Sequence, residues 1–305
     1  MKIVACGDLH LTDSSPKRRL DDYSSVLMEK FLYIVNYTMN EQYKVMVLPG
    51  DIFDTHRASN QLISTTIKTL SNFVDTGGVV LGVLGQHDLA FRSPHNSPVR
   101  VLEAAGIITM LSEKPFRLNG VSFYGSDFGS KVPDVMEREE KRILVIHKMI
   151  SDRDYWGSNL EYSSVSSFLK ENGRFDIVIS GDNHHSFDYK QAGRNQRVLI
   201  NAGSLGRRSI DQIDHKPCFY VVDTDQVERS RIEVPIQNNV FDLSSLEGEK
   251  RVSEEIAKFV DGLAKHSEFT FTERYEDRVV QIIESNDIEP KVKELVYLFL
   301  TDPES

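Results

Sequence analysis

The sequence predicts an α/β protein with a largely parallel sheet covered on both faces, followed by a small α+β appendage. Short apolar runs alternate with segments whose apolar residues recur at helical spacing, which is typical of strand–helix–strand units. The runs are apolar throughout rather than alternating with polar residues, and this indicates strands buried on both faces. The pattern changes near residues 235–239, a polar stretch typical of a domain boundary.

Each expected element follows from a local signal. Pro49-Gly50 ends one strand, and Gly77-Gly78 stops one helix. We expect strands at residues 3–6, 45–48, 79–84, 107–111, 121–124, 143–146, 177–179, 198–200, 219–222 and 229–234. We expect helices at residues 22–40, 58–74 and 99–105, with one more between 150 and 171.

The chain is expected to divide into two domains, residues 1–235 and 240–305. Beyond the boundary the pattern predicts a helix at 253–263, strands at 269–272 and 278–283, and a helix at 290–300. A segment as short as 240–305 lies near the lower limit for independent stability. We therefore expect it to pack on the main domain.

The composition, 40% hydrophobic and 27% charged over 305 residues, is that of a globular protein. Two distant cysteines argue against a disulfide framework and favour a reducing, cytoplasmic location. No leader peptide and no membrane span are expected. The net charge of −10 lacks the basic footprint of a general nucleic-acid binder, although bound divalent metals would offset part of it.

Five short loops that contain Asp or His follow apolar runs, in one order along the chain. They are Asp8-Leu9-His10, Gly50-Asp51, Gly85-Gln86-His87-Asp88, His147, and Gly181-Asp182-Asn183-His184. Strand ends of this kind can bring carboxylates and imidazoles to one edge of a sheet. Such an edge suits two divalent metals, and many enzymes use two metals to hydrolyse phosphate esters.

The first two loops each supply a carboxylate, from Asp8 and Asp51. Asp8 and His10 lie two apart in an extended segment, so both side chains can face one ion. Gly50 permits a sharp turn, and the two oxygens of Asp51 can bridge two metals. Taken alone, Asp8 would be interpreted as a residue that caps its loop. Asp51 alone would be interpreted as a helix N-cap or a turn residue. Asp54, in the loop of Asp51, is expected to have that structural role.

The third loop combines an amide, an imidazole and a carboxylate. Gln86 can offer an amide oxygen to a hard metal, which leaves His87 free to face a substrate. Asp88 is expected to hold the His87 imidazole and raise its pKa, keeping it available as a general acid. His147 and His184 would each read alone as an ordinary buried or surface histidine. His56 and His185, beside the motifs, stay undecided.

Taken in series, the loops resemble those of the calcineurin-like metallophosphoesterase family. The family pattern is Asp-x-His, Gly-Asp, Gly-Asn-His-Asp/Glu, His and Gly-His-x-His, and the match covers roughly residues 1–235. Within the family the chain looks most like the SbcD/Mre-type DNA-repair nucleases, including phage versions. The supporting segments are Gly50-Asp51-Ile52-Phe53-Asp54 and Asn201-Ala202-Gly203-Ser204. The resemblance implies a sandwich of two β-sheets flanked by helices, and a small cap domain.

The resemblance also implies two metal ions, most often Mn²⁺ with Mg²⁺ as the alternative. One ion would be held by Asp8, His10, Asp51 and His184, and the other by Asp51, Gln86, His147 and Asp182. His87 would lie near the scissile phosphate. Two residues depart from the family pattern, because Gln86 stands where the family has Asn and Asp182 where it has His. Asp182 is the preferred ligand at this position, and His185 is the alternative.

The implied function is DNA cleavage as a nuclease subunit in repair, recombination or replication. The implied partners are DNA and an SbcC-like coiled-coil ATPase that would dock near residues 290–300, and a homodimer is possible. A stand-alone phosphatase or cyclic-nucleotide phosphodiesterase remains an alternative because the same loops serve those chemistries. A third reading, a catalytically inactive scaffold, is disfavoured because the ligands and His87 are all present.

Overall fold

The computed structural model describes residues 1–90, 93–135, 141–153, 161–191 and 196–244. Residues 1–241 form one compact unit. The boundary at 235–240 and the predicted α+β appendage stay predictions, because nearly all of the appendage lies outside the described residues. Within the described ranges, no helix is long and apolar enough to cross a membrane.

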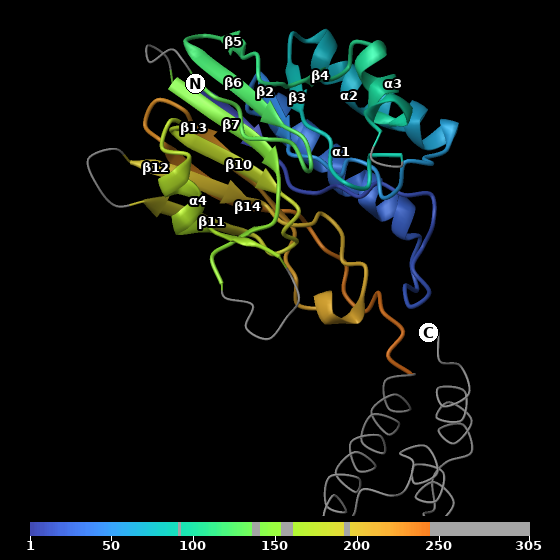
Figure 1. The fold of residues 1–305 in the computed structure, drawn as a ribbon. Helices are drawn as coiled ribbons and strands as arrows, with labels where there is room; N and C mark the ends of the chain where they lie inside the picture. The colour runs from blue at the N-terminus through green and yellow to red at the C-terminus, as the bar shows by residue number, and fades with distance from the viewer. Residues whose placement is uncertain (91–92, 136–140, 154–160, 192–195, 245–305) are drawn as a thin grey trace, which may run out of the picture. The chain divides into compact units, whose positions relative to one another are not determined.

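Two six-stranded mixed sheets form the centre of this unit (Figure 1). The first has the order β14–β13–β1–β2–β3–β4, with β1 Lys2–Ala5, β2 Val45–Leu48, β3 Val79–Gly82, β4 Thr109–Met110, β13 Cys218–Asp223 and β14 Glu228–Glu233. The second has the order β11–β12–β10–β7–β6–β5, with β5 Phe116–Leu118, β6 Val121–Ser126, β7 Lys141–His147, β10 Ile177–Gly181, β11 Phe187–Gln191 and β12 Arg197–Asn201. A short parallel pair, β8 Ile150–Ser151 and β9 Ser163–Ser164, stands apart.

Helices cover the outer face of each sheet. On the first sheet lie α1 Tyr23–Asn40, α2 Asn60–Asp75 and α3 Val99–Ala104, and on the second lies α4 Val165–Glu171 (Figure 1). The short 3₁₀ turns are η1 Pro94–Asn96 and η2 Ile210–Gln212. The side chains of Asp22, Ser59 and Ser164 cap α1, α2 and α4 by accepting a backbone N–H.

The expected strand–helix alternation and the two-sheet sandwich are both confirmed. The expected cover on both faces is found for each sheet, with helices on the outer face and the other sheet on the inner face. Ile3, Val47 and Leu81 of the first sheet share a buried cluster with Ile179 and Ile200 of the second. A fully apolar strand can be buried by helices or by a second sheet, so the apolar pattern alone does not show which of the two covers a given face.

The parallel strands point the chain in one direction within each sheet. Strands β1, β2 and β3 run parallel in the first sheet, and β6, β7, β10 and β12 run parallel in the second. The loops after β1, β2, β3, β7 and β10 are those that the sequence singled out. The fold therefore collects all five at the strands' carboxyl ends, across the seam between the sheets.

We expect the core between the sheets to dominate stability, which a pair of isoleucines can test. Ile200 is fully buried there, whereas Ile213 is 41% exposed. Ile200→Ala should lower the free energy of unfolding by about 2–5 kcal/mol, because it removes buried methyl groups and leaves a cavity. Ile213→Ala should change it by less than about 0.5 kcal/mol. Urea denaturation measures both, and equal losses would contradict this assignment of the core.

Candidate metal centre

The five loops bring their polar side chains together. Asp8, His10 and His184 each offer a ligand atom, and these atoms lie within 4.8 Å of one another. His10, Asp51 and His87 form a second such group that shares His10. The two groups therefore overlap, as they would around neighbouring ions.

Three of the motif residues have a backbone conformation that residues with side chains seldom adopt. His10, Asp51 and Asp182 all have positive φ, at 46°, 47° and 81°. Each lies just past a strand, where the chain turns sharply so that its side chain faces the seam. Positive φ costs energy outside glycine, so these three turns are strained at the place where the motif side chains meet.

Glycines at two strand ends permit the close approach of the loops. A Cβ on Gly85 would lie 2.0 Å from Oδ1 of Asp51, and one on Gly181 would lie 2.5 Å from Oδ1 of Asp8. Any side chain at either position would displace a carboxylate. Gly85 and Gly181 therefore let the chain turn and also leave space for the carboxylates of Asp51 and Asp8.

Two fully buried carboxylates, those of Asp8 and Asp51, are anchored by backbone amides. The N–H of Asp182 donates to both oxygens of Asp8, at 3.0 and 3.3 Å, and the N–H of His87 donates to Oδ1 of Asp51 at 2.9 Å. Burial raises the pKa of Asp8 well above its usual value, and the nearby Asp51 and Asp182 raise it further. The site therefore concentrates negative charge where water is excluded.

The residues proposed for the second ion contain unpartnered polar atoms. Oδ2 of Asp51 and Nε2 of His147 lie 3.4 Å apart, yet neither makes a hydrogen bond with the described residues. Oε1 of Gln86 is likewise buried without a hydrogen-bond partner among them, while its Nε2 donates to Asp182 Oδ1 at 2.9 Å. Buried polar atoms are nearly always paired, so atoms left unpaired around one space fit missing cations.

The imidazoles respond to these charges in opposite directions. Burial alone would lower the pKa of His147, but Asp51 and Asp8 raise it to about 10. Burial and the neighbouring His10 lower the pKa of His184 to about 4. Nδ1 of His147 donates to the Pro49 carbonyl at 2.7 Å, which turns Nε2 toward the carboxylates. A cation bound at Nε2 would displace its proton.

The expected contact between Asp88 and the His87 ring was wrong. The buried Asp88 carboxylate accepts N–H groups of Ile52, Phe53 and Gly85, so it ties together the loops after β2 and β3. Burial and the nearby Asp51 raise its pKa to about 7. Nδ1 of the exposed His87 ring lies instead 2.7 Å from the Asp54 carbonyl. A backbone carbonyl has no sequence signature, so the residues could not reveal this partner.

Sequence reasoning also missed the importance of Asp54. Its side chain lies 3.4 Å from Nδ1 of His10 and forms an ion pair with Arg208. The N-cap of the following helix is Ser59, so Asp54 is a turn residue that orients two imidazoles. The sequence contained no signal that linked Arg208 to the site.

Two asparagines, Asn201 and Asn183, hold the last loop in place by hydrogen bonds to backbone carbonyls. Nδ2 of Asn201, at the end of β12, donates to the carbonyls of Asn183 and His185. Nδ2 of Asn183 donates to the Ile150 carbonyl at 2.9 Å. His184 is thereby positioned beside Nε2 of His10, 3.1 Å away. His185 is exposed, and like His147 and Asp182 it belongs to neither ligand group found among the described residues.

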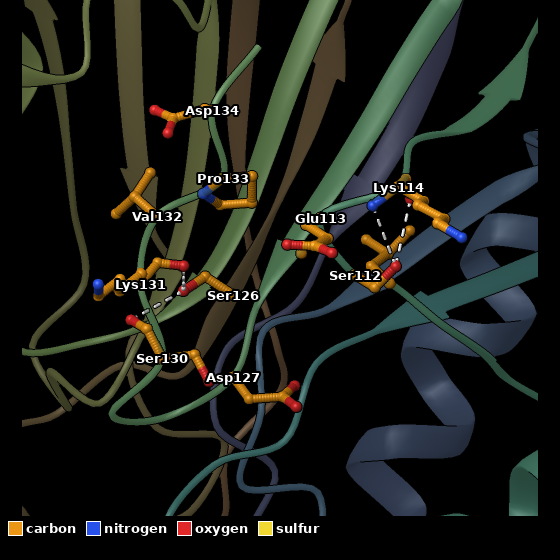
Figure 2. Close-up of a pocket in the computed structure, with 12 residues that line it drawn as sticks. Ser112, Glu113, Lys114, Ser126, Asp127, Ser130, Lys131, Val132, Pro133 and Asp134 are labelled. Carbon is orange, nitrogen blue, oxygen red and sulfur yellow. Dashed lines mark hydrogen bonds between the residues drawn. The ribbon is translucent and has the colours of Figure 1, made fainter.

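Two cavities open near these loops. One of about 600 Å³ lies around Ser126, Asp127 and Ser130 and includes none of the clustered side chains (Figure 2). Another of about 500 Å³ is lined by His147 and Asp182. The smaller cavity is therefore the one that adjoins the candidate metal centre.

Comparison with known proteins agrees with this geometry. The Mre11 DNA double-strand break repair protein of Methanosarcina acetivorans is 22% identical over 275 residues, covering 84% of this chain and 42% of that protein. The Mre11 protein of Haloferax volcanii is 23% identical over 275 residues, covering 85% of this chain and 58% of that protein. The chain thus spans about half the length of the curated relatives that it matches.

Among solved structures, a dimetal phosphatase from Danio rerio aligns with a TM-score of 0.43 and 14% identity, over 77% of this chain and 99% of that one. A family model described as calcineurin-like phosphoesterase matches residues 1–186, which contain all five loops. The chain belongs to the calcineurin-like phosphoesterase family, a family of hydrolases with a dimetal centre.

Proposed function

We propose that this protein is a two-metal nuclease that cleaves DNA in repair, recombination or replication, in the cytoplasm of a bacterial or phage-infected cell. The observation that carries the proposal is the convergence of the five loops around unpartnered ligand atoms. The similarity to Mre11 proteins over most of the chain supports DNA as the substrate, rather than a small phosphate ester.

The residues assigned to the first cation fit that role. Asp8, His10 and His184 already form a compact group of ligand atoms, and Asp51 Oδ2 lies 3.6 Å from His10 Nε2. The low pKa of His184 keeps its ring neutral at pH 7, as a metal ligand must be.

The residues assigned to the second cation are Asp51, Gln86, His147 and Asp182. The first three contribute the unpartnered atoms described above, and Asp182 contacts Gln86. An amide and two carboxylates make this a hard ligand set, which supports Mn²⁺ or Mg²⁺. The hydrogen bond to Gln86 favours Asp182 over the exposed His185 as the fourth ligand.

His87 is proposed as the group that protonates the leaving oxygen. The Asp54 carbonyl can only accept, so Nδ1 of His87 carries a proton and the other ring nitrogen is left for a substrate. The ring lies edge-on to His10, with centroids 4.8 Å apart, at the exposed side of the cluster. The bound cations would supply Lewis acidity for the phosphate and a lowered pKa for the attacking water.

The Asp54–Arg208 pair supports this arrangement. The Asp54 carboxylate contacts His10 while its carbonyl contacts His87, so one residue orients both rings. Arg208 pairs with that carboxylate and is itself more than half exposed. We propose that the pair holds His10 in the position required for metal binding.

The proposed partners follow from the same relationship. An SbcC-like coiled-coil ATPase would supply the basic DNA surface that this acidic chain lacks, and a homodimer is a further possibility. The docking segment predicted at residues 290–300 lies outside the described residues. Pull-down of an ATPase subunit by the full chain tests this part of the proposal, and full DNA cleavage without one would contradict it.

Cation binding should stabilise the fold, and a glycine variant should abolish the effect. Mn²⁺ at about 100 times its Kd should add about 2.7 kcal/mol to the free energy of unfolding. Gly85→Ala should remove this gain, since its Cβ would push Asp51 aside. Gly173→Ala is the control, because its Cβ would meet only the flexible end of Arg197. Thermal denaturation with and without Mn²⁺ measures the gain, and a full gain in Gly85→Ala would refute the assignment.

Removal of the His87 imidazole should separate chemistry from metal binding. His87→Ala should lower kcat about 10²–10⁴-fold, the usual contribution of a general acid. Its metal content, measured by elemental analysis, should remain that of the wild type. His95→Ala, at another exposed histidine, should keep full activity. Loss of metal from His87→Ala would make His87 a ligand instead.

The choice of substrate decides between nuclease and phosphatase. With Mn²⁺, the wild type should cleave linear duplex or single-stranded DNA and lose this activity in EDTA. Hydrolysis of a small aryl phosphodiester without any DNA cleavage would overturn the nuclease proposal. Absence of hydrolysis on every phosphoester, despite bound metal, would instead indicate a scaffold.

A further inference from the structure

The cavity that adjoins the metal centre has walls that the proposed metal chemistry does not use. Its volume is about 500 Å³, within the range typical of small-molecule sites. His147 and Asp182 form one part of the lining, and Phe128, Met149 and Tyr162 form another. A phosphate at the metal centre would therefore lie next to a space with aromatic walls.

Phe128 is unusually exposed for a ring so close to a polar centre. Its exposed fraction is 39%, and its ring centroid lies 6.2 Å from that of His147, at an interplanar angle of 68°. Because Phe128 both lines the cavity and keeps this exposed area, it offers an apolar aromatic surface to whatever occupies the cavity.

The turn that carries Phe128 is held in place. The N–H of Phe128 donates to the Leu84 carbonyl at 2.8 Å, and the N–H of Leu84 donates to Asp127 Oδ1 at 2.8 Å. The hydroxyl of Ser126 also contacts the carbonyls of Ser130 and Lys131, at 3.3 and 3.2 Å (Figure 2). Leu84 directly precedes Gly85, so the aromatic ring and the metal centre share one support.

The charges of the cavity favour a neutral, flat occupant over a second phosphate. Apart from the clustered residues, the lining contains one cation, Lys148, and one anion, Glu161. Their charges balance, so these walls offer no net attraction to an anion. Aromatic faces bind nucleobases by stacking, whichever the base.

We propose that Phe128 stacks against the base of an unpaired nucleotide that flanks the scissile phosphate. The inference rests on the proposed nuclease function and deepens it. A base inside a duplex is covered on both faces by its neighbours, so only an unpaired or frayed base can lie flat on Phe128. The cavity therefore selects single-stranded or opened ends at the position of cleavage.

The test uses single-stranded oligonucleotides with one cleavable linkage and phosphorothioates elsewhere. The nucleotide on the 5′ or the 3′ side of that linkage is either intact or abasic. For the wild type with Mn²⁺, removal of the base on one side should lower kcat/KM about 5- to 150-fold, the value expected for one stacked base. Phe128→Ala should cause a similar loss on the intact substrate and little further loss on the abasic one.

Two further variants separate stacking from folding. Phe128→Trp keeps an aromatic face and should retain most of the discrimination between the intact and abasic substrates. Tyr33→Ala removes a ring of similar exposure, 38%, from helix α1 and should change nothing. Both Phe128 variants should bind as much Mn²⁺ as the wild type, measured by elemental analysis, because Phe128 offers no ligand atom. Methyl p-nitrophenyl phosphate, a small diester, reports the phosphodiesterase activity of the wild type without a nucleotide.

The outcomes distinguish this inference from the proposal on which it rests. Wild-type cleavage of intact and abasic substrates at equal rates would overturn the stacking role alone. Equal losses by Phe128→Ala on both substrates would also overturn it, since the two changes would then be independent. Hydrolysis of the small diester without cleavage of any oligonucleotide would overturn the nuclease function and the stacking site together.

Discussion

Buried negative charge at the ends of strands β1 and β2 is the constraint on which the rest of the structure depends. Asp8 and Asp51 are excluded from solvent, and an isolated buried carboxylate is strongly unfavourable. The backbone amides of Asp182 and His87 and the imidazole of His147 compensate part of this cost. The part of the cost that remains is an electrostatic reason for the site to bind cations. Their charge would balance the carboxylates, which the protein alone leaves close together.

The architecture meets this constraint by placing the acids at a seam between two sheets. The first sheet supplies the loops that carry His10, Asp51 and His87, and the second sheet brings His184 to Asp8 and His10. Residues with positive φ aim the side chains inward, and each costs about 1–3 kcal/mol of strain. That cost persists only because the loops continue rigid strands whose apolar side chains fill the space between the sheets. The apolar core thus stabilises a polar site that is strained in itself.

Under the proposed function, the two sides of the centre would act on different parts of a phosphodiester. Near His10 lie His87 and the Asp54–Arg208 pair, which suit proton transfer and the orientation of imidazoles. Near His147 lie the cavity and Phe128, which suit the base of a neighbouring nucleotide. The departures from the family pattern, Gln86 and Asp182, are on this second side and contact each other. The base-binding wall and the altered ligands are therefore neighbours.

Apolar runs, glycines and acids leave local signals, so the sequence predicted ten of the fourteen described strands, the four α-helices and the five loops. It also singled out the side chains of both ligand groups, because these side chains follow strand ends. The tertiary structure added the strands β5, β8, β9 and β11, the role of Asp88 as a backbone anchor and the contact of the Asp54 carbonyl with His87. The contributions of Arg208 and Phe128 were equally hidden. These contacts join residues far apart in sequence or involve backbone atoms, and neither kind leaves a pattern along the chain.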